Sequence, residues 1–185
     1  MQNVDLKSSL KKLNLGCGLI KFKDFINIDI NEKCKPDEIL DISKELPKLA
    51  QEYWEEIRLF KTLEYISLDL QFDVLSEIRN LLVDEGKLQI VYPDYGKLPW
   101  FYLDNHKGKR KYWQECLYGK QDHEFAYVRG IYHFQEIKDM LFELGLVIDN
   151  ISSNNIEGYS CYICVKSSIK LPTYEESITK EILGV

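Results

Sequence analysis

A glycine-rich turn directly after a short apolar run restricts the fold more than any other feature of the sequence. The run from Lys12 to Leu15 ends in Gly16-Cys17-Gly18, and a second run, residues 25–30, alternates in polarity and carries Asp29 near its end. Both patterns are typical of β-strands. A glycine turn lets a ligand lie against bare backbone, and an acid after the next strand can accept both hydroxyls of a ribose. The two runs therefore predict a nucleoside site at the start of an α/β fold.

The next part of the chain continues the alternation of strands and helices. We expect strands over residues 38–40, 56–60 and 87–92, and helices over residues 43–54, with Ser43 as the N-cap, and 70–82. A turn at residues 84–86 separates the second helix from the fifth strand. This alternation predicts a Rossmann-like, mainly parallel sheet, in which ligands bind outside the carboxyl ends of the strands.

The C-terminal part departs from this alternation. Residues 95–132 are rich in aromatic and charged side chains, and we interpret them as an insertion that covers the site. A helix over residues 137–144, closed by Gly145, leads to strands over residues 146–151 and 159–165, which predict an antiparallel hairpin at one sheet edge. The 185 residues fit one domain, with a core over residues 11–166 and a tail over residues 167–185.

Composition excludes several classes of protein. The chain has 24 basic and 30 acidic residues, a net charge of −6, which argues against a nucleic-acid partner. No apolar run reaches the length of a membrane span, and the first residues do not resemble a signal peptide, so we expect a cytoplasmic protein. Of the five cysteines, only Cys161 and Cys164 have metal-like spacing, but in a strand they point to opposite faces. We therefore expect buried thiols and no metal site.

The segment between the first two strands selects the kind of nucleoside cofactor. A dinucleotide needs a third glycine and the start of a full helix for its pyrophosphate, but Lys21 stands where that glycine should be. The six residues Leu19 to Asp24 would make only about 9 Å of helix, so the first helix is cut to a turn at best. A cofactor without phosphates tolerates this loss. The sequence therefore favours S-adenosylmethionine over a nicotinamide dinucleotide, and the missing glycine and the shortened helix argue against a dehydrogenase.

With these strands, turns and acidic residues, the sequence resembles a family of short, predicted S-adenosylmethionine-dependent methyltransferases that are found beside bacterial surface-polysaccharide genes. The resemblance covers about residues 11–166 and rests on motifs that occur in the same order: Leu13-Asn14-Leu15-Gly16-Cys17-Gly18, Phe25-Ile26-Asn27-Ile28-Asp29-Ile30, Asp41-Ile42 with Leu46-Pro47, Leu63-Glu64, Gly86-Lys87-Leu88-Gln89-Ile90, Pro93-Asp94 and Leu117-Tyr118-Gly119-Lys120-Gln121. The chain departs from the family at Lys61, Tyr65 and Val128-Arg129, where the family tends to carry histidine or histidine-lysine.

The resemblance implies a set of cofactor contacts. Residues Asn14 to Gly18, thus including Leu15, Gly16 and Cys17, would line the methionine moiety. Asp29 would bind the ribose, with Ile30 beside it, and Asp41 with Ile42 would contact the adenine. Thr62, Leu63 and Glu64 would form the opposite wall of the site.

Methyl transfer needs alignment of an acceptor atom with an already activated carbon, and it needs no covalent nucleophile. A hydroxyl acceptor benefits from a base, and the candidates are His123, Asp94 and His133, in that order. The aromatic insertion either builds an acceptor pocket or forms a small satellite core. The basic run Lys107 to Lys111 would suit a phosphorylated acceptor, or it is a solvated loop.

Two functions follow from the resemblance and its departures. The first is a small-molecule O-methyltransferase whose acceptor is a saccharide or a related cell-surface glycan precursor. The second is a catalytically silent domain that keeps the fold and acts as a binding or regulatory partner, a reading supported by Tyr65 and Val128. The acceptor and the oligomeric state stay open.

Overall fold

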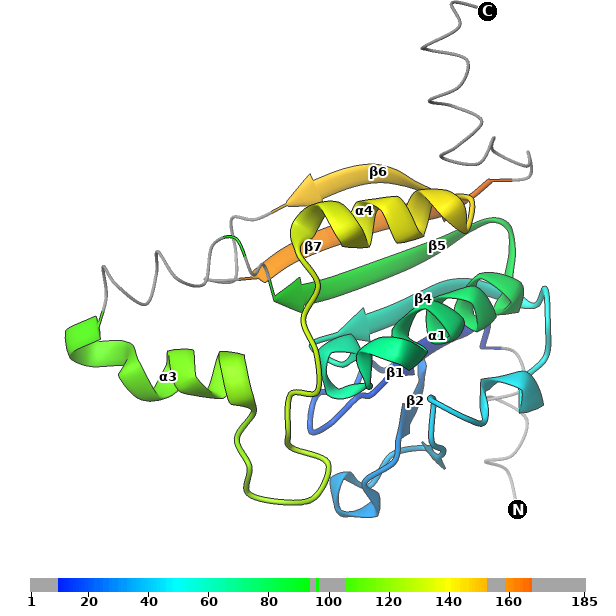
Figure 1. The fold of residues 1–185 in the computed structure, drawn as a ribbon. Coiled ribbons are helices and arrows are strands. Elements are labelled where there is room, and N and C mark those ends of the chain that lie inside the picture. Colours follow the sequence, from blue (N-terminus) through cyan, green and yellow to red (C-terminus); the bar gives the residue numbers. More distant parts are fainter. Residues whose placement is uncertain (1–9, 94–95, 97–105, 153–158, 168–185) are drawn as a thin grey trace, which may run out of the picture.

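The protein forms a seven-stranded sheet with helices packed on it (Figure 1). The computed structural model describes residues 10–93, 96, 106–152 and 159–167, without the side chains of residues 106–110. The strands are β1 (Lys12–Leu15), β2 (Ile26–Asp29), β3 (Glu38–Ile39), β4 (Trp54–Phe60), β5 (Leu82–Pro93), β6 (Leu146–Ser152) and β7 (Tyr159–Lys166). They lie in the order β3-β2-β1-β4-β5-β7-β6.

The sheet is parallel except at one end. Strand β1 pairs in parallel with β2 and β4, β2 with β3, and β4 with β5. Strand β7 runs antiparallel between β5 and β6. The carboxyl ends of β1, β2, β4 and β5 therefore meet along one edge, as the sequence predicts, and the predicted C-terminal hairpin is confirmed.

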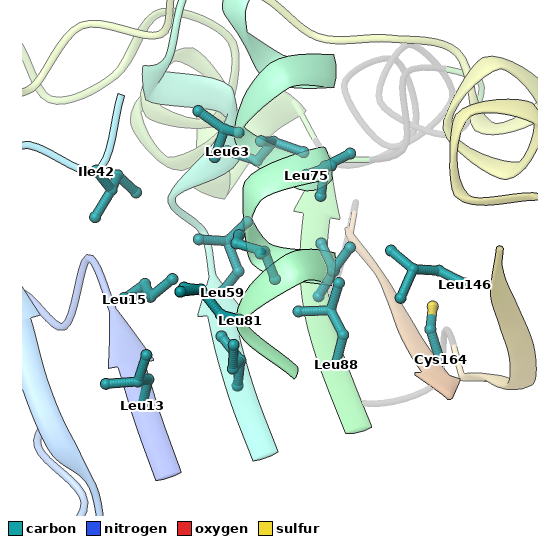
Figure 2. Packing of buried hydrophobic residues seen from close by; sticks show 14 of the residues in the cluster. Leu13, Leu15, Ile42, Leu59, Leu63, Leu75, Leu81, Leu88, Leu146 and Cys164 are labelled. Atoms are coloured by element: carbon teal, nitrogen blue, oxygen red, sulfur yellow. The ribbon is translucent and has the colours of Figure 1, made fainter. Parts of the chain in front are cut away.

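One face of the sheet is covered by two amphipathic helices, α1 (Leu68–Leu81) and α4 (Phe134–Glu143), which both lie in front of the strands in Figure 1. Three apolar side chains of α1, Leu75, Ile78 and Leu81, are fully buried against the strands. Figure 2 shows leucines of the strands and of α1 meeting in this core. Burial of apolar area in this layer is the main stabilising contribution to the fold.

The prediction of a helix over residues 43–54 is wrong. The structure has a single 3-10 turn, η2 (Leu46–Lys48), and Trp54 already belongs to β4. Pro47 has no backbone N–H to donate to the carbonyl oxygen of Ser43, four residues earlier, which disfavours a helix that starts at Ser43. Glu52 then adopts a left-handed conformation with φ 49°, and the chain continues as an extended strand.

The crossover from β1 to β2 contains no helix, since residues 16–25 form only turns, as predicted from its length. The buried side chain of Asn27 holds this loop in place. Its Oδ1 accepts hydrogen bonds from Asn14 Nδ2 at 3.0 Å and Phe22 N at 2.9 Å. Its Nδ2 donates to the carbonyl oxygens of Phe22 and Phe25. Side-chain hydrogen bonds therefore satisfy the backbone polar groups of this loop, which in a longer crossover are satisfied within a helix.

The inserted segment contains a helix that the sequence analysis did not predict, α3 (His106–Tyr118). Two of its side chains, Trp113 and Cys116, are buried against Val91 of β5 and Tyr159 of β7. This contact makes a second, smaller core at the carboxyl end of the sheet. Trp113 therefore fits the satellite-core reading of the insertion, whereas Trp100, Phe101 and Tyr102 lie outside the described residues.

Two features are absent from the described part of the chain. No helix there has the length and hydropathy of a membrane span. Nor do three or more histidine, cysteine or acidic side chains gather there in a group suited to a metal ion.

Candidate functional site

The glycine turn after β1 is shaped by one close contact. Gly16 has φ 65°, and a Cβ at this position would lie 2.2 Å from Cγ2 of Thr62. The Thr62 hydroxyl also donates toward the carbonyl oxygens of Leu15 and Gly16 at 3.3 and 3.2 Å. Only glycine combines this backbone conformation with this approach. Thr62, two residues after β4, thereby fixes the turn that follows β1.

The second glycine of the turn borders open space. Gly18 has φ 51°, and a Cβ there would meet no atom within 4 Å. Its backbone N–H donates to Oδ2 of Asp29 at 2.7 Å. The other carboxylate oxygen, Oδ1, accepts from the backbone N–H of Asn31 at 2.8 Å. Each oxygen keeps a lone pair, so the carboxylate is held in place and still able to accept two hydroxyl groups.

Three residues hold the backbone of the glycine turn in place, Asn14 and Leu15 at the end of β1 and Cys17 within the turn. Leu15 is fully buried, and Cys17 is 6% exposed. Burial, with the nearby Asp29 charge as the next cause, raises the pKa of the Cys17 thiol to about 11, so this thiol stays protonated. The buried Asn14 donates to the carbonyl oxygen of Ile20 as well as to Asn27. These side chains shape the backbone that the turn presents.

A cavity of about 280 Å³ is lined by Ile30 and Asn31, the two residues that follow Asp29, and by residues of the inserted segment. One wall comes from the residues that follow β2, and the other comes from the inserted segment. The lining residues are Ile30, Asn31, Glu32, Lys33, Ile39, His123, Glu124 and Phe125. The cavity thus brings the predicted residues Ile30 and His123 together. The sequence predicts Phe125 only as one of the aromatic side chains of the inserted segment, because no spacing marks it out from the others.

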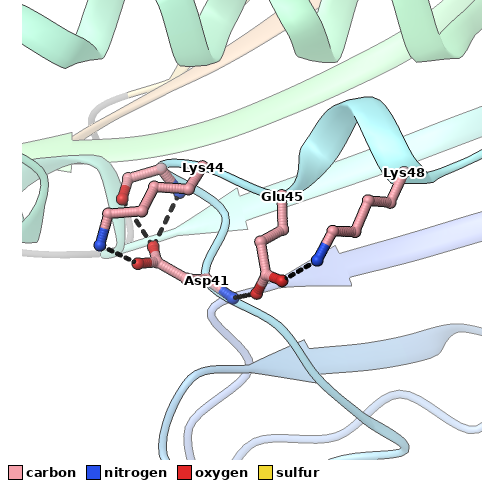
Figure 3. A network of polar contacts seen from close by, with 5 residues as sticks. Asp41, Lys44, Glu45 and Lys48 are labelled. Carbon is pink, nitrogen blue, oxygen red and sulfur yellow. Dashed lines mark hydrogen bonds and ion pairs between the residues drawn. The ribbon is translucent and has the colours of Figure 1, made fainter.

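The Asp41 side chain binds residues of the turn that follows it (Figure 3). Its Oδ1 accepts from the backbone N–H and the hydroxyl of Ser43, and its Oδ2 pairs with Lys44 at 2.9 Å. Partial burial acts to raise the pKa of Asp41, but these hydrogen bonds outweigh it and lower the pKa below its ordinary value. Glu45, which pairs with Lys48, accepts from the Asp41 backbone N–H. The next side chain, Ile42, is buried in the main core.

Glu64 is the most unusual polar group at this edge of the sheet. It lies in η3 (Leu63–Tyr65), directly after β4, and like Leu63 it is fully buried. Neither carboxylate oxygen has a hydrogen-bond partner among the described residues. Burial raises the pKa of the Glu64 carboxyl to about 8. Glu64 is therefore a neutral carboxylic acid at pH 7, and a buried group without partners marks a position where a ligand group can bind.

The surroundings of Glu64 are aromatic and weakly acidic. Burial, with the nearby Glu64 carboxylate as the next cause, raises the pKa of Tyr65 to about 12 and also raises the pKa of Tyr159, so these groups lie near one another. The Lys61 ammonium lies 4.2 Å from the centre of the Tyr159 ring. Tyr159 also shares a side-chain hydrogen bond with Cys116 of α3. Glu64 therefore lies near the second core under α3, two residues after Thr62, which contacts the glycine turn.

The three candidate bases occupy different places. His123 is exposed, and its Nδ1 accepts from the backbone N–H of Phe125 at 3.2 Å. His133 is the N-cap of α4: its Nδ1 accepts from Gln135 N, and Glu136 reaches back to the backbone N–H of His133 at 2.7 Å. Asp94 follows the last residue of β5 and lies outside the described residues. His133 thus has a structural role that accounts for its side chain.

No family model matches the sequence, and no curated protein matches it. Solved structures do match the fold. One is a SAM-dependent methyltransferase from Archaeoglobus fulgidus, with 16% identity and a TM-score of 0.58 over 86% of this chain and 89% of that one. Another, from Methanosarcina mazei, has 12% identity and a TM-score of 0.62 over 84% and 92% of the chains.

A third similar structure carries ligands. It is the 1,6-didemethyltoxoflavin-N1-methyltransferase of Burkholderia thailandensis with bound 1,6-didemethyltoxoflavin and S-adenosylhomocysteine. Its identity to this chain is 11% and its TM-score 0.55, over 85% of this chain and 71% of that one. At such identities the similarity shows the fold. The chain therefore has the Rossmann-like fold of S-adenosylmethionine-dependent methyltransferases, with antiparallel strands at its C-terminal edge.

Proposed function

We propose that the protein is an S-adenosylmethionine-dependent methyltransferase. The observation that carries the proposal is the fixed carboxylate of Asp29, held by Gly18 N and Asn31 N beside a glycine turn that is open to a ligand. This geometry fits a nucleoside whose ribose diol binds the carboxylate and whose other end lies along the turn. The fold supports the same conclusion, since the similar solved structures include S-adenosylmethionine-dependent methyltransferases.

The bound cofactor would supply a methyl group that is already activated by a sulfonium. The chain's own residues then position the two reactants. Residues 14–18 and Asp29 hold the cofactor, with Ile30, Asp41 and Ile42 toward the base. Thr62, Leu63 and Glu64 close the opposite wall, where the unpaired carboxyl of Glu64 meets a polar group of a ligand. The small core under α3 limits the access of water from the β5 and β7 side.

The acceptor in this proposal is a small molecule that is methylated on oxygen, a saccharide or related cell-surface glycan precursor. The support is the sequence resemblance to methyltransferases beside surface-polysaccharide genes. Asp94 is the favoured base, because it directly follows β5 and because both histidines already make other contacts, at Phe125 N and Gln135 N. An acceptor O–H would transfer its proton to this carboxylate as the new C–O bond forms and the C–S bond breaks.

Calorimetric titration with S-adenosylhomocysteine tests the cofactor assignment. The wild-type protein should bind, and Asp29→Asn should weaken binding by roughly 1–3 kcal/mol, because the introduced NH₂ group faces a backbone N–H and can no longer accept a hydroxyl. Asp149→Asn, an exposed site on β6, is the matched control and should bind like wild type. Equal affinity of wild type and Asp29→Asn would contradict the assignment.

Formation of S-adenosylhomocysteine from S-adenosylmethionine tests catalysis separately. Sugar nucleotides, free saccharides and their phosphates are the acceptors to supply. Product formed with one of them supports the transferase. Binding of both cofactor forms without turnover of any of these acceptors favours the silent binding or regulatory domain instead.

A further inference from the structure

The cavity beyond Asp29 has the position expected for the base of a nucleoside. Asp29 separates the glycine turn from the cavity, because it accepts from Gly18 on one side and Asn31 on the other. Asn31 and its neighbour Ile30 line the cavity wall. A ribose on this carboxylate therefore directs one substituent along the turn and the other into the cavity.

The size and charge of the cavity restrict its occupant. Its volume of about 280 Å³ lies just below the usual range for small-molecule sites, so it has room for one ring system and not for a whole cofactor. Two acidic residues, Glu32 and Glu124, and one lysine, Lys33, contribute to its lining. This balance disfavours a phosphate group, while Ile30 and Phe125 offer apolar surface to a neutral aromatic ring.

The outer wall is a turn of the inserted segment that the fold holds in place from both sides. At its base, Gly119 has φ 79° and approaches the Ala126 carbonyl so closely that a Cβ there would lie 2.1 Å from the oxygen. Gln121 N donates to the same oxygen at 2.9 Å. Beyond the turn, Arg129 N donates to the carbonyl oxygen of Glu64 at 2.8 Å. The turn is thus preformed over the cavity.

Within the turn, His123 supports Phe125. The imidazole Nδ1 accepts from Phe125 N, so this lone pair is already used, and Nε2 lies 3.6 Å from Oδ1 of Asp122. The His123 and Phe125 rings are 6.2 Å apart and tilted by 59°. His123 therefore orients the Phe125 ring at the cavity wall and has no free acceptor at Nδ1 for a substrate proton.

We propose that the turn His123–Phe125 of the inserted segment covers the purine base of the cofactor, with the Phe125 ring stacked on it. The inserted segment then contributes directly to cofactor binding, and His123 is a positioning residue and not the base of the methyl transfer. The proposal rests on the proposed function, because it places the adenine of S-adenosylmethionine in the cavity next to Asp29.

Calorimetry with two ligands tests this contact. S-Adenosylhomocysteine and 5′-methylthioadenosine share the adenosine, but only the first has the amino-acid end. Phe125→Ala should weaken both by the same factor, about tenfold, as expected for loss of one base–aromatic stack at a partly exposed site. Phe125→Leu should also weaken both, whereas Phe125→Trp, which keeps a flat ring, should retain wild-type affinity. Phe142→Ala, on α4, is the matched control with unchanged affinity.

The outcomes separate this inference from the proposed function. Absence of S-adenosylhomocysteine binding to the wild-type protein overturns the proposed function, and this inference with it. Wild-type binding with no loss in Phe125→Ala leaves the cofactor assignment intact and overturns the stacking contact. Loss for S-adenosylhomocysteine alone also overturns it, because that result places Phe125 at the amino-acid end. A thermal melt of each variant checks that it is folded at the temperature of the binding measurement.

Discussion

The backbone N–H of Gly18 lies 2.7 Å from Oδ2 of Asp29 and donates a hydrogen bond to it, so the turn after β1 and the end of β2 form one unit. This bond fixes the carboxylate at the border between the turn and the cavity lined by Ile30 and Phe125. A ligand-binding carboxylate that is already oriented loses little conformational entropy on binding. The relationship explains how a site can form here without the helix that usually follows β1.

The two turn glycines should respond differently to alanine. Gly16→Ala should destabilise the fold by about 3 kcal/mol, because a left-handed alanine is strained and its Cβ collides with Thr62. Gly18→Ala should lower the free energy of unfolding by only about 1 kcal/mol, because its left-handed backbone is strained but its Cβ meets no atom. The same Cβ enters the open space beside the turn and should weaken S-adenosylhomocysteine binding. Urea unfolding and calorimetry measure the two effects.

A double variant checks the cause of the Gly16 effect. Because the Thr62 side chain is the colliding group, Gly16→Ala combined with Thr62→Ala should be less destabilised than the sum of the single variants. An additive result would show that backbone strain, and not the contact with Thr62, limits position 16.

His133 should matter for the stability of α4 and not for chemistry. Removing the cap in His133→Ala should lower the free energy of unfolding by about 1 kcal/mol, while His133→Asn, a good N-cap, should keep it near wild type. Urea unfolding measures both variants, with Glu143→Gln at the other end of α4 as a neutral surface control. A loss of transferase turnover in His133→Asn at unchanged stability would instead support the catalytic reading of this histidine.

The sequence predicted the parts of the fold that depend on periodic patterns. The period-two run at β2 and the helical spacing of α1 and α4 correspond to elements that contribute side chains to the main core, and burial determines such patterns. The helix expected over residues 43–54 failed because Pro47 and the Asp41 turn determine the local conformation there, against an apparent cap at Ser43. Helix α3 was missed because its buried residues, Trp113 and Cys116, are too few to make a period.

The sequence predicted the candidate site only where the type of a single residue indicates its backbone conformation or its place at the end of a strand. Glycines at positive φ and an acid at a strand end marked Gly16, Gly18 and Asp29. The position of the Phe125 turn and the burial of the Glu64 carboxyl arise from contacts between segments far apart in the chain. One such contact is the hydrogen bond from the backbone N–H of Arg129 to the carbonyl oxygen of Glu64. No spacing in the sequence encodes those contacts, so only the folded structure shows them.

Glu64 should make the stability of the protein depend on pH. Its pKa is 4.5 in an unfolded chain and about 8 in the fold, so the folded state holds the extra proton between these values. The stabilisation is complete below pH 4.5 and is lost as the pH rises to about 8, by up to about 1.4 kcal/mol per pH unit. In Glu64→Gln this dependence should vanish, whereas Glu143→Gln should follow wild type. Urea unfolding at pH 5, 6, 7 and 8 gives the difference, and parallel curves for wild type and Glu64→Gln would show that this carboxyl is solvated.

Asn27 should be essential to the helix-free crossover. Asn27→Leu keeps the branched shape of the side chain but leaves the buried amide of Asn14 and the backbone groups of Phe22 and Phe25 without their partner. With a penalty of roughly 1–3 kcal/mol for each unsatisfied buried group, we expect a loss of about 3 kcal/mol or more in the free energy of unfolding. Asn80→Leu, at a half-buried site on α1, should change stability by less than about 1 kcal/mol. Because the same loop carries Gly18, S-adenosylhomocysteine binding should fall in Asn27→Leu and not in Asn80→Leu, and an unaffected loop would appear as equal affinity in the two variants.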